Sequence, residues 1–346
     1  MDYKNIELSI IIPVYNMEQY LRRCLNSVIK AVENLQDTVE VLIINDGSKD
    51  SSPKIIKEYC EKYSYMKQYD KVNGGLSDVK NYGLERAKGN YVIFLDSDDY
   101  VEPKMYAVML AELKKEKADV VVCDIELVYD EPEKNVVCPC NIVSRDEAFD
   151  QIIDMNMMPA SWNKIVKREL YEGLTFPVGK NNEDVAVTPI VLGRAKKIAV
   201  VNRPFYKYYQ RSGSIQNSVF DERRFVILET SKICVERIKE LNETKQDKIK
   251  GSVYLHQVLS LALYLIRREK LKNRYIMLKK YMSRVEKELP DIWDNFEIKE
   301  FLTWDGKLIQ IYRRISVFLM KNKLYLLLSL FWSMCNIVLL LIKKEN

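Results

Sequence analysis

The sequence predicts an α/β fold: a mainly parallel sheet with flanking helices, followed by a C-terminal helical region. Three observations support this prediction. Short β-branched runs alternate with helical patterns over the first 130 residues, polar clusters follow several of these runs, and from residue 218 the pattern becomes helical with few breakers. Strands that alternate with helices imply right-handed crossovers, and nearly continuous apolar strands indicate that both faces of the sheet are covered.

The expected elements follow one another in a regular order. Short apolar, β-branched runs predict strands at residues 9–14, 40–44, 67–70, 91–95 and 119–128. Apolar residues at helical spacing predict helices at residues 17–35, 51–62, 77–88 and 103–117. Further along the chain we expect a helix at 181–193, a strand at 197–201, a polar aromatic loop at 206–217 and a helical block at 218–289.

A chain of 346 residues is too long for one small core, and we expect two or three structural units. The predicted divisions are an α/β domain at residues 1–217, a helical domain at 218–300 and a basic, apolar tail at 301–346. Apolar residues make up 47% of the chain and charged residues 30%, so a disordered or fibrous protein is excluded.

The positive charge is concentrated in the tail. The chain has 54 Lys and Arg against 49 Asp and Glu, a net charge of +5. Residues 301–346 hold seven of the basic and two of the acidic residues, which leaves 47 of each in the rest of the chain. A nucleic-acid-binding protein would spread its charge over a binding face, so we expect no nucleic-acid partner. A basic tail beside an apolar helix instead predicts contact with an anionic membrane surface.

The tail contains an apolar segment at residues 324–342, which has no charged residue and is flanked by lysines. Three interpretations are open: a single-pass anchor, a helix lying in the plane of the membrane, and a helix buried in the protein. Near the N-terminus, the apolar run Leu8–Val14 is too short for a secretory signal. We therefore expect the protein at the cytoplasmic face of the cell membrane.

The histidine and cysteine content excludes several kinds of chemistry. The single histidine, His256, lies in an apolar helical segment, where a structural role is expected. Ser-His or Cys-His catalysis and histidine metal clusters are therefore hard to build, so a general base must be a carboxylate, Lys or Tyr. Seven cysteines without a CxxC pair argue against a zinc site, and they favour a reducing cytosol.

Polar clusters follow three of the predicted strands. They are PVYN at residues 13–16, NDGS at 45–48 and DSDD at 96–99. Ligands of open α/β sheets bind beyond the carboxyl ends of the strands, so we expect the three clusters to converge on one crevice.

Asp96-Ser97-Asp98 is a DxD pattern directly after an apolar strand. Hard cations such as Mg²⁺ or Mn²⁺ prefer carboxylate oxygens, and they commonly bind a diphosphate at the same time. A turn with helix-capping acids is the plainer interpretation of the same residues.

Three further polar positions have a structural and a functional interpretation. Asp46 suits either a loop or a contact to a base or ribose hydroxyl. Gly74-Gly75 suits either a simple turn or a helix start that offers backbone N–H groups to phosphate. Glu183-Asp184 suits either stabilisation of a helix N-terminus or a general base that deprotonates an acceptor alcohol.

These segments together resemble the family-2 glycosyltransferases of the GT-A fold, of the bacterial type that builds surface polysaccharide on a lipid carrier. The matching segments occur in the family order and cover roughly residues 7–215; they are SIIIPVYNMEQYLRRCLNSV, VLIINDGSKDSS, NGGLSDVKNYGLERAKGNYVIFLDSDDYV and NNEDVAVTPIVLGRA.

The resemblance implies a role for each candidate residue. Asp98, with Asp96, would bind a divalent cation, Mn²⁺ or Mg²⁺. Asp184 would be the catalytic base with Glu183 beside it, and Trp162 would line the acceptor side. The residues implied to bind the nucleotide sugar are Pro13, Tyr15, Asp46, Gly75, Lys80, Asp96, Ser97 and Arg211.

Two positions depart from the family pattern. Similar proteins usually have Arg where this chain has Lys80, and Lys lacks the planar fork for bidentate phosphate binding. The QxxRW motif of processive synthases is not reproduced at Gln210-Arg211, which favours transfer of one sugar per encounter.

The resemblance implies an inverting single displacement from a nucleotide diphosphate sugar, with a UDP-sugar as the favoured donor. A lipid-linked saccharide acceptor suits the basic tail, while soluble and protein acceptors stay open, and residues 218–300 are a candidate surface for acceptor binding or homo-oligomerisation. Two alternatives are a non-catalytic, nucleotide-sugar-binding membrane scaffold and a sugar nucleotidyltransferase. The latter should have a Gly-rich loop after the first strand, where this chain has PVYNMEQYL.

Overall fold

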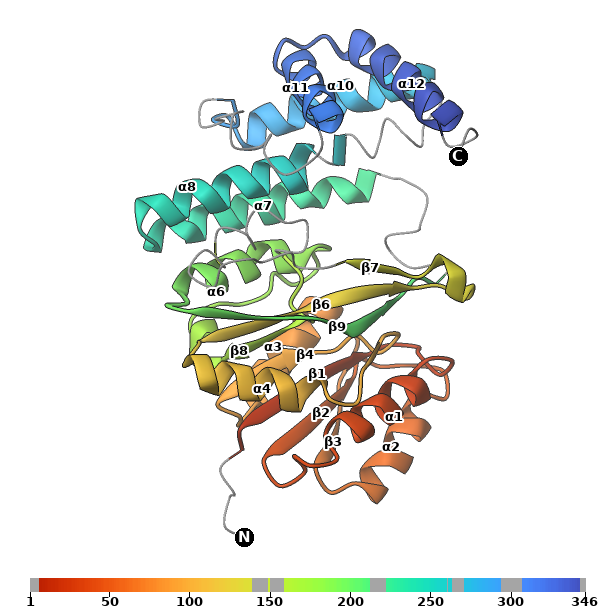
Figure 1. Cartoon of the computed structure of the whole chain (residues 1–346), viewed down its shortest axis with the longest axis vertical. Coiled ribbons are helices and arrows are strands. Elements are labelled where there is room, and N and C mark those ends of the chain that lie inside the picture. Colours follow the sequence, from red (N-terminus) through yellow and green to blue (C-terminus); the bar gives the residue numbers. More distant parts are fainter. Residues whose placement is uncertain are drawn as a thin grey trace. The chain divides into compact units, whose positions relative to one another are not determined.

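The computed structural model describes residues 6–138, 149, 159–211, 222–259, 261–262, 271–293 and 307–342. The chain divides into two compact units, Met1–Ser218 and Val219–Asn346 (Figure 1). The first unit contains the sheet, and the second is helical in the part that the structure describes. A separation of residues 301–346 from 218–300 stays a prediction.

The first unit is built on one mixed sheet in the order β3-β2-β1-β4-β8-β6-β9-β5, with β7 paired to β6. The described strands are β1 (Leu8–Val14), β2 (Val39–Asn45), β3 (Met66–Asp70), β4 (Tyr91–Phe94), β5 (Tyr100–Val101), β6 (Val120–Val128), β7 (Val136–Cys138), β8 (Lys164–Lys167) and β9 (Ile198–Tyr209). Strands β3, β2, β1 and β4 are parallel, as are β6 and β9. The predicted α/β fold with flanking helices is therefore confirmed.

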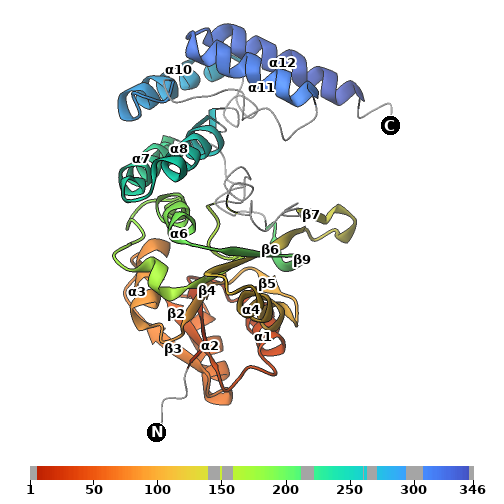
Figure 2. The same cartoon turned by 60° about the vertical axis from the view of Figure 1, so that its left-hand side comes forward.

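Helices cover both faces of the sheet (Figures 1 and 2). They are α1 (Leu21–Ala31), α2 (Ser52–Lys62), α3 (Leu76–Arg86), α4 (Met105–Glu116) and α6 (Thr188–Arg194). Helices α1, α2 and α4 supply side chains to the same buried cluster, whereas α3 packs on the opposite face of β1 and β2.

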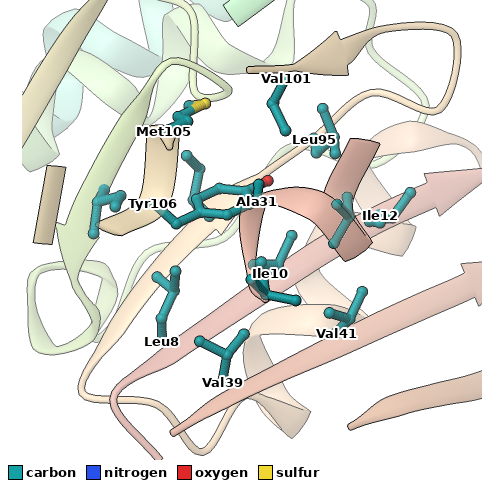
Figure 3. Close-up of a cluster of buried hydrophobic side chains, with 14 of the residues drawn as sticks. Leu8, Ile10, Ile12, Ala31, Val39, Val41, Leu95, Val101, Met105 and Tyr106 are labelled. Carbon is teal, nitrogen blue, oxygen red and sulfur yellow. The ribbon is translucent and has the colours of Figure 1, made fainter. Parts of the chain in front are cut away.

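The main core forms because alternate residues of a strand point to the same face. Leu8, Ile10 and Ile12 of β1 face one side and meet Val39 and Val41 of β2, together with side chains from α1 and α4 (Figure 3). All seven residues of β1 are buried, as expected for a strand covered on both faces.

Three elements differ from the expected bounds. The helix expected at 17–35 is shorter, Leu21–Ala31. The helix expected at 181–193 starts as a 3₁₀ turn, Glu183–Ala186, and becomes α-helical from Thr188, where Pro189 occupies the first turn. The prediction of a loop from residue 206 is wrong for residues 206–209. Strand β9 continues to Tyr209 and pairs with β6 beyond an irregularity in register.

Strands β5, β7 and β8 have no counterpart among the expected elements. They contain two, three and four residues, so they carry too little periodicity to be detected. Each pairs antiparallel with a neighbour, which makes the sheet mixed.

The second unit is built of helices in its described residues, both in the block expected at 218–289 and in the tail. They are α7 (Val226–Arg237), α8 (Glu243–Ser252), the π-helical turn η6 (Val253–Leu259), α10 (Leu271–Glu288), α11 (Lys307–Lys321) and α12 (Tyr325–Ile342). Asn242 caps α8 by accepting a hydrogen bond from the Lys245 backbone N–H at 3.0 Å. The side chain of His256, in η6, lies outside the described residues.

Helices α11 and α12 pack on each other through buried polar and aromatic side chains. The indole Nε1 of Trp332 donates to Ser316 Oγ at 2.8 Å, and Leu328 is fully buried. Within the portion of the chain that the structure describes, no helix has both the length and the apolar character needed to cross a membrane.

Candidate active site

The loops after β1, β2 and β4 lie at the carboxyl ends of parallel strands, where α/β sheets bind ligands. Asn45 ends β2 and pairs with Val14 at the end of β1. Leu95, which follows β4, donates its backbone N–H to Ile11 O at 2.9 Å. The acidic loops at Asp46 and Asp96 therefore start from β2 and β4, the two strands that flank β1.

Asp46 organises the turn before α3. Its carboxylate accepts hydrogen bonds from the backbone N–H groups of Gly74 at 2.9 Å and Gly75 at 2.8 Å, and from Lys71 Nζ at 2.8 Å. Gly75 has a φ of 84°, which favours glycine. Asp46 and Gly75 were both expected to contact the nucleotide sugar, and in this structure they bind each other.

The DSDD loop is held by residues at the end of β9. Arg211 Nε donates to Asp98 Oδ2 at 2.6 Å. The buried Asp99 accepts from Tyr206 OH at 2.7 Å and from the Tyr209 backbone N–H at 2.8 Å. Hydrogen bonds thus fix the loop after β4 to the end of β9, which lies 110 residues later in the sequence.

Burial and neighbouring acids perturb the ionisation of this loop. Burial, with a further contribution from Asp98, raises the pKa of Asp96 to about 7, although the charge of Lys80 opposes the shift. Burial also raises the pKa of Asp99 well above its usual range. Crowded carboxylates repel one another, and a bound cation or a proton relieves that repulsion.

A second acidic cluster surrounds Lys80. Its ammonium group donates to Glu183 Oε1 at 2.7 Å, Asp184 Oδ1 at 2.7 Å and Ser161 Oγ at 3.1 Å. Burial by itself lowers the pKa of Lys80, but the charges of Asp184 and Glu183 outweigh it, so the net shift is upward. Before the cluster, Asn182 turns the chain with a left-handed backbone (φ 59°).

Glu183 and Asp184 differ in exposure. The Asp184 side chain is 16% exposed and the Glu183 side chain 8%. Burial raises the pKa of Glu183, against the opposing charge of Lys80. Asp184 is therefore the carboxylate of the two that an incoming hydroxyl reaches more easily.

The other expected site residues occupy varied positions. Tyr15 is 45% exposed beyond the end of β1, and Pro13 is a buried residue of that strand. Ser97 is buried in the DSDD loop. Trp162 stacks on Tyr206 at a ring-centroid distance of 4.3 Å, so its ring packs against β9.

A cavity of about 610 Å³ adjoins Arg211. Its lining is polar, and the residues that form it are Asn16, Glu18, Gln19, Tyr20, Lys49, Asp50 and Arg211. Because Arg211 also contacts Asp98, the cavity borders the DSDD loop.

The acidic residues suit a cation shared with a ligand better than a cation held by the protein alone. In the described ranges, no three His, Cys, Asp or Glu side chains form a metal-binding group. Mg²⁺ typically takes one or two carboxylates and completes its shell with water and substrate phosphates. Asp98 and Asp96 fit that pattern.

Several residues that build the site were not expected from the sequence. Lys71, Ser161, Asp99 and Tyr206 contribute hydrogen bonds to it. Asp99 lay within a recognised acidic run, which was a usable signal. Tyr206 and Ser161 carry no local signal, because their partners are 107 and 81 residues away in the sequence.

The mixed sheet with acidic loops beyond its parallel strands β2 and β4 has the layout of an α/β enzyme that binds its ligand at this edge of the sheet. The sequence profile of glycosyl transferase family 2 matches residues 9–181, half of the 346-residue chain. The chain therefore belongs to glycosyl transferase family 2 and is a glycosyltransferase enzyme. Glu183, Asp184 and Arg211 lie beyond the matched segment.

Bacterial relatives share part of the chain. It is 31% identical over 224 residues to the glycosyltransferase GlyA of Streptococcus pneumoniae, a match that covers 60% of this chain and 31% of GlyA. It is 28% identical over 253 residues to the putative glycosyltransferase EpsH of Bacillus subtilis, covering 69% of this chain and 72% of EpsH. The chain thus spans less than a third of the length of the first relative.

The fold is also shared with a solved structure. The crystal structure of S. aureus TarS residues 1–349 in complex with UDP-GlcNAc superimposes with a TM-score of 0.71. The likeness covers 95% of this chain and 92% of that one, at 20% sequence identity.

Proposed function

We propose that the protein transfers a sugar from a nucleoside diphosphate sugar to an acceptor hydroxyl with inversion of configuration. One observation carries this proposal: the Asp184 carboxylate and Asp96 of the DSDD loop both interact with the buried ammonium group of Lys80. Asp96 and Asp184 both interact electrostatically with Lys80 and with each other. A single displacement needs a base for the acceptor and an acidic loop for the diphosphate side of the donor, and here both lie next to Lys80.

Asp184 is the proposed general base. It accepts the proton of the acceptor hydroxyl as that oxygen attacks the anomeric carbon, and the bond to the diphosphate breaks on the opposite face. Arg211, released from Asp98, is the proposed partner of the departing diphosphate. Asp98, with Asp96, would hold a divalent cation, which neutralises charge on the leaving group when bound.

A UDP-sugar is the proposed donor. The structurally similar TarS was solved with UDP-GlcNAc, and the exposed ring of Tyr15 is available to a base. Asp46 supports the nucleotide site by fixing the Gly74–Gly75 turn. The proposed acceptor is a lipid-linked saccharide in the synthesis of a surface polysaccharide.

Helices α11 and α12 are the proposed contact to an anionic membrane surface. Among the side chains of these helices that the structure describes, the exposed apolar ones are Ile311, Ile315, Phe318, Leu326, Leu327, Leu330 and Met334. The tail also carries the excess of basic residues, and both features favour binding at a lipid interface. Phe318→Glu with Leu330→Glu should abolish co-sedimentation with anionic vesicles, whereas the wild type should bind these and not neutral vesicles.

The decisive experiment measures nucleotide release from UDP-, GDP- and dTDP-sugars with and without Mn²⁺. Wild type is compared with Asp98→Asn and Asp184→Asn. We expect slow, Mn²⁺-dependent release from one UDP-sugar, reduced about 100-fold or more in both variants. A product that retains the donor configuration would exclude the single displacement.

Cleavage of none of the donors, with lipid extract present, would favour a nucleotide-sugar-binding scaffold. The sugar nucleotidyltransferase alternative has no support, because the chain belongs to glycosyl transferase family 2.

A further inference from the structure

The side chain of Lys80 is buried among aromatic, acidic and hydroxyl side chains. Its side chain is 1% exposed, and Nζ lies 5.4 Å from the ring centroid of Phe94 and 5.2 Å from that of Phe176. A protonated lysine has three N–H donors, and Glu183, Asp184 and Ser161 accept from them. A diphosphate could be bound by this ammonium group only if one of the three bonds broke.

Asp184 is fixed from two directions. Its Oδ1 accepts from Lys80, and its Oδ2 accepts from the Ser161 backbone N–H at 3.3 Å. Since a carboxylate has about four lone-pair sites, each oxygen keeps the capacity to accept one more hydrogen bond. The 16% of the side chain that is exposed leaves room for a hydroxyl to reach it.

We propose that Lys80 is a positioning residue, which holds the proposed base Asp184 and its neighbour Glu183 in a reactive orientation and does not bind the donor. This inference rests on the proposed function, in which Asp184 accepts the proton. It differs from the expectation that Lys80 contacts the nucleotide sugar, because the hydrogen bonds of Lys80 are directed at the carboxylate pair.

The chemistry of the pair explains why a buried cation is needed. Two adjacent carboxylates in a buried site repel each other, and without a counter-charge one of them takes up a proton. The titratable groups that interact with Lys80 are Asp184, Glu183, Asp96 and Tyr171. A fixed ammonium group therefore supplies the counter-charge that the carboxylate pair needs.

The test compares Lys80→Met with wild type in hydrolysis of the UDP-sugar identified above, with water as acceptor. We expect kcat to fall about 10- to 100-fold while KM for the donor changes by less than about two-fold. The acidic limb of the pH profile should move to higher pH, since the charge of Lys80 opposes protonation of Glu183 in the carboxylate pair.

Conservative replacement and a matched control separate positioning from general stability. Lys80→Arg should recover most of the lost kcat, because it keeps the charge. Lys67→Met removes another lysine paired with a buried carboxylate, Glu40, at 2.8 Å on β3, and should leave kcat and the pH profile unchanged. If Lys80→Met does not fold, Lys80→Ala is tested for recovery of kcat by added ethylammonium.

Two outcomes would overturn the inference. A raised donor KM with unchanged kcat in Lys80→Met would assign Lys80 to the diphosphate, and an unshifted pH profile with normal kcat would make it structural. Failure of the proposed function is distinguishable, because Asp184→Asn would then keep its activity whatever Lys80→Met does.

Discussion

Arg211 and Asp98 form an ion pair that joins the end of β9 to the loop after β4. The two side chains are 22% and 18% exposed, and their contact distance is 2.6 Å. Arg211 thus neutralises the carboxylate on which a cation would have to bind. The cation proposed to bind Asp98 would therefore compete with Arg211 for this carboxylate.

Replacing Arg211 should strengthen cation binding in the absence of nucleotide. Because partly exposed ion pairs contribute about 1 kcal/mol or less, we expect Arg211→Gln to bind Mn²⁺ up to about five-fold more tightly than wild type. Isothermal titration calorimetry with Mn²⁺ alone measures this. Arg203→Gln, where the guanidinium lies 4.9 Å from the ring of Phe205, serves as the control and should bind like wild type. Weaker binding in Arg211→Gln would contradict the competition.

At the same scale, sequence reasoning correctly placed Asp46 and Asp96 beyond the carboxyl ends of parallel strands. That they share one crevice stays a prediction. The partner of Lys80 could not be derived, since Glu183 and Asp184 lie 103 and 104 residues away and reach it through the tertiary fold.

Among the secondary-structure elements, α3 approaches the sheet closely at Gly83. A methyl group at this position would come within 2.5 Å of Ile11 Cγ2 and 3.0 Å of Ile44 Cδ1. Both neighbours belong to the central strands β1 and β2, which have little freedom to shift. The distance between helix and sheet therefore depends on the absence of a side chain.

Gly83→Ala should lower the free energy of unfolding by about 1–3 kcal/mol through overpacking. The matched control is Gly251→Ala in α8, where a methyl group meets nothing within 4 Å. That substitution should stabilise the protein by up to about 1 kcal/mol, because alanine favours a helix over glycine. Urea denaturation followed by circular dichroism compares the two; equal effects would refute the close approach.

Glu40 connects several elements through its buried carboxylate. It accepts from Ser9 Oγ at 2.8 Å, from Lys67 Nζ at 2.8 Å and from the Lys88 backbone N–H at 2.7 Å. Burial alone would raise the pKa of Glu40, but these hydrogen bonds outweigh it and the net pKa is lowered. The ionised form therefore stabilises the fold.

Glu40→Gln should cost about 1–2 kcal/mol of unfolding free energy at pH 7. A folded-state pKa below the unfolded value of about 4.3 means that the stabilisation is present above that pH and disappears as pH falls through the folded pKa. The difference between wild type and variant should hence shrink below about pH 4 in urea titrations. Glu61→Gln, from an exposed pair with Lys57, should have little effect at either pH.

Element prediction succeeded for long, periodic segments and failed for short or irregular ones. Strands β1 and β2 each have seven buried residues, and their apolar runs can be recognised from the local sequence alone. The end of β9 was mistaken for a loop because its aromatic and polar residues, FYKYY, are ordered by pairing with β6 and β5. Such pairing depends on residues that are distant in sequence.

At the level of the whole molecule, the chain separates into a sheet unit and a helical unit. The core of the sheet unit is drawn from residues 8–206, and the buried cluster contains no residue of the second unit. The proposed catalytic and donor-binding residues also lie within Met1–Ser218. Folding and donor binding should therefore need the first unit alone.

A fragment of residues 1–218 should fold and unfold cooperatively. Trp162 is the single tryptophan in this range and stacks on Tyr206, so its fluorescence reports on the packing of β9. We expect fluorescence and circular dichroism to give the same urea midpoint, as a two-state unit requires. The fragment should also bind UDP with an affinity within about three-fold of the full chain, since binding free energy would differ by less than about 1 kcal/mol. Non-coincident transitions, or loss of UDP binding in a folded fragment, would mean that residues after 218 complete the donor site.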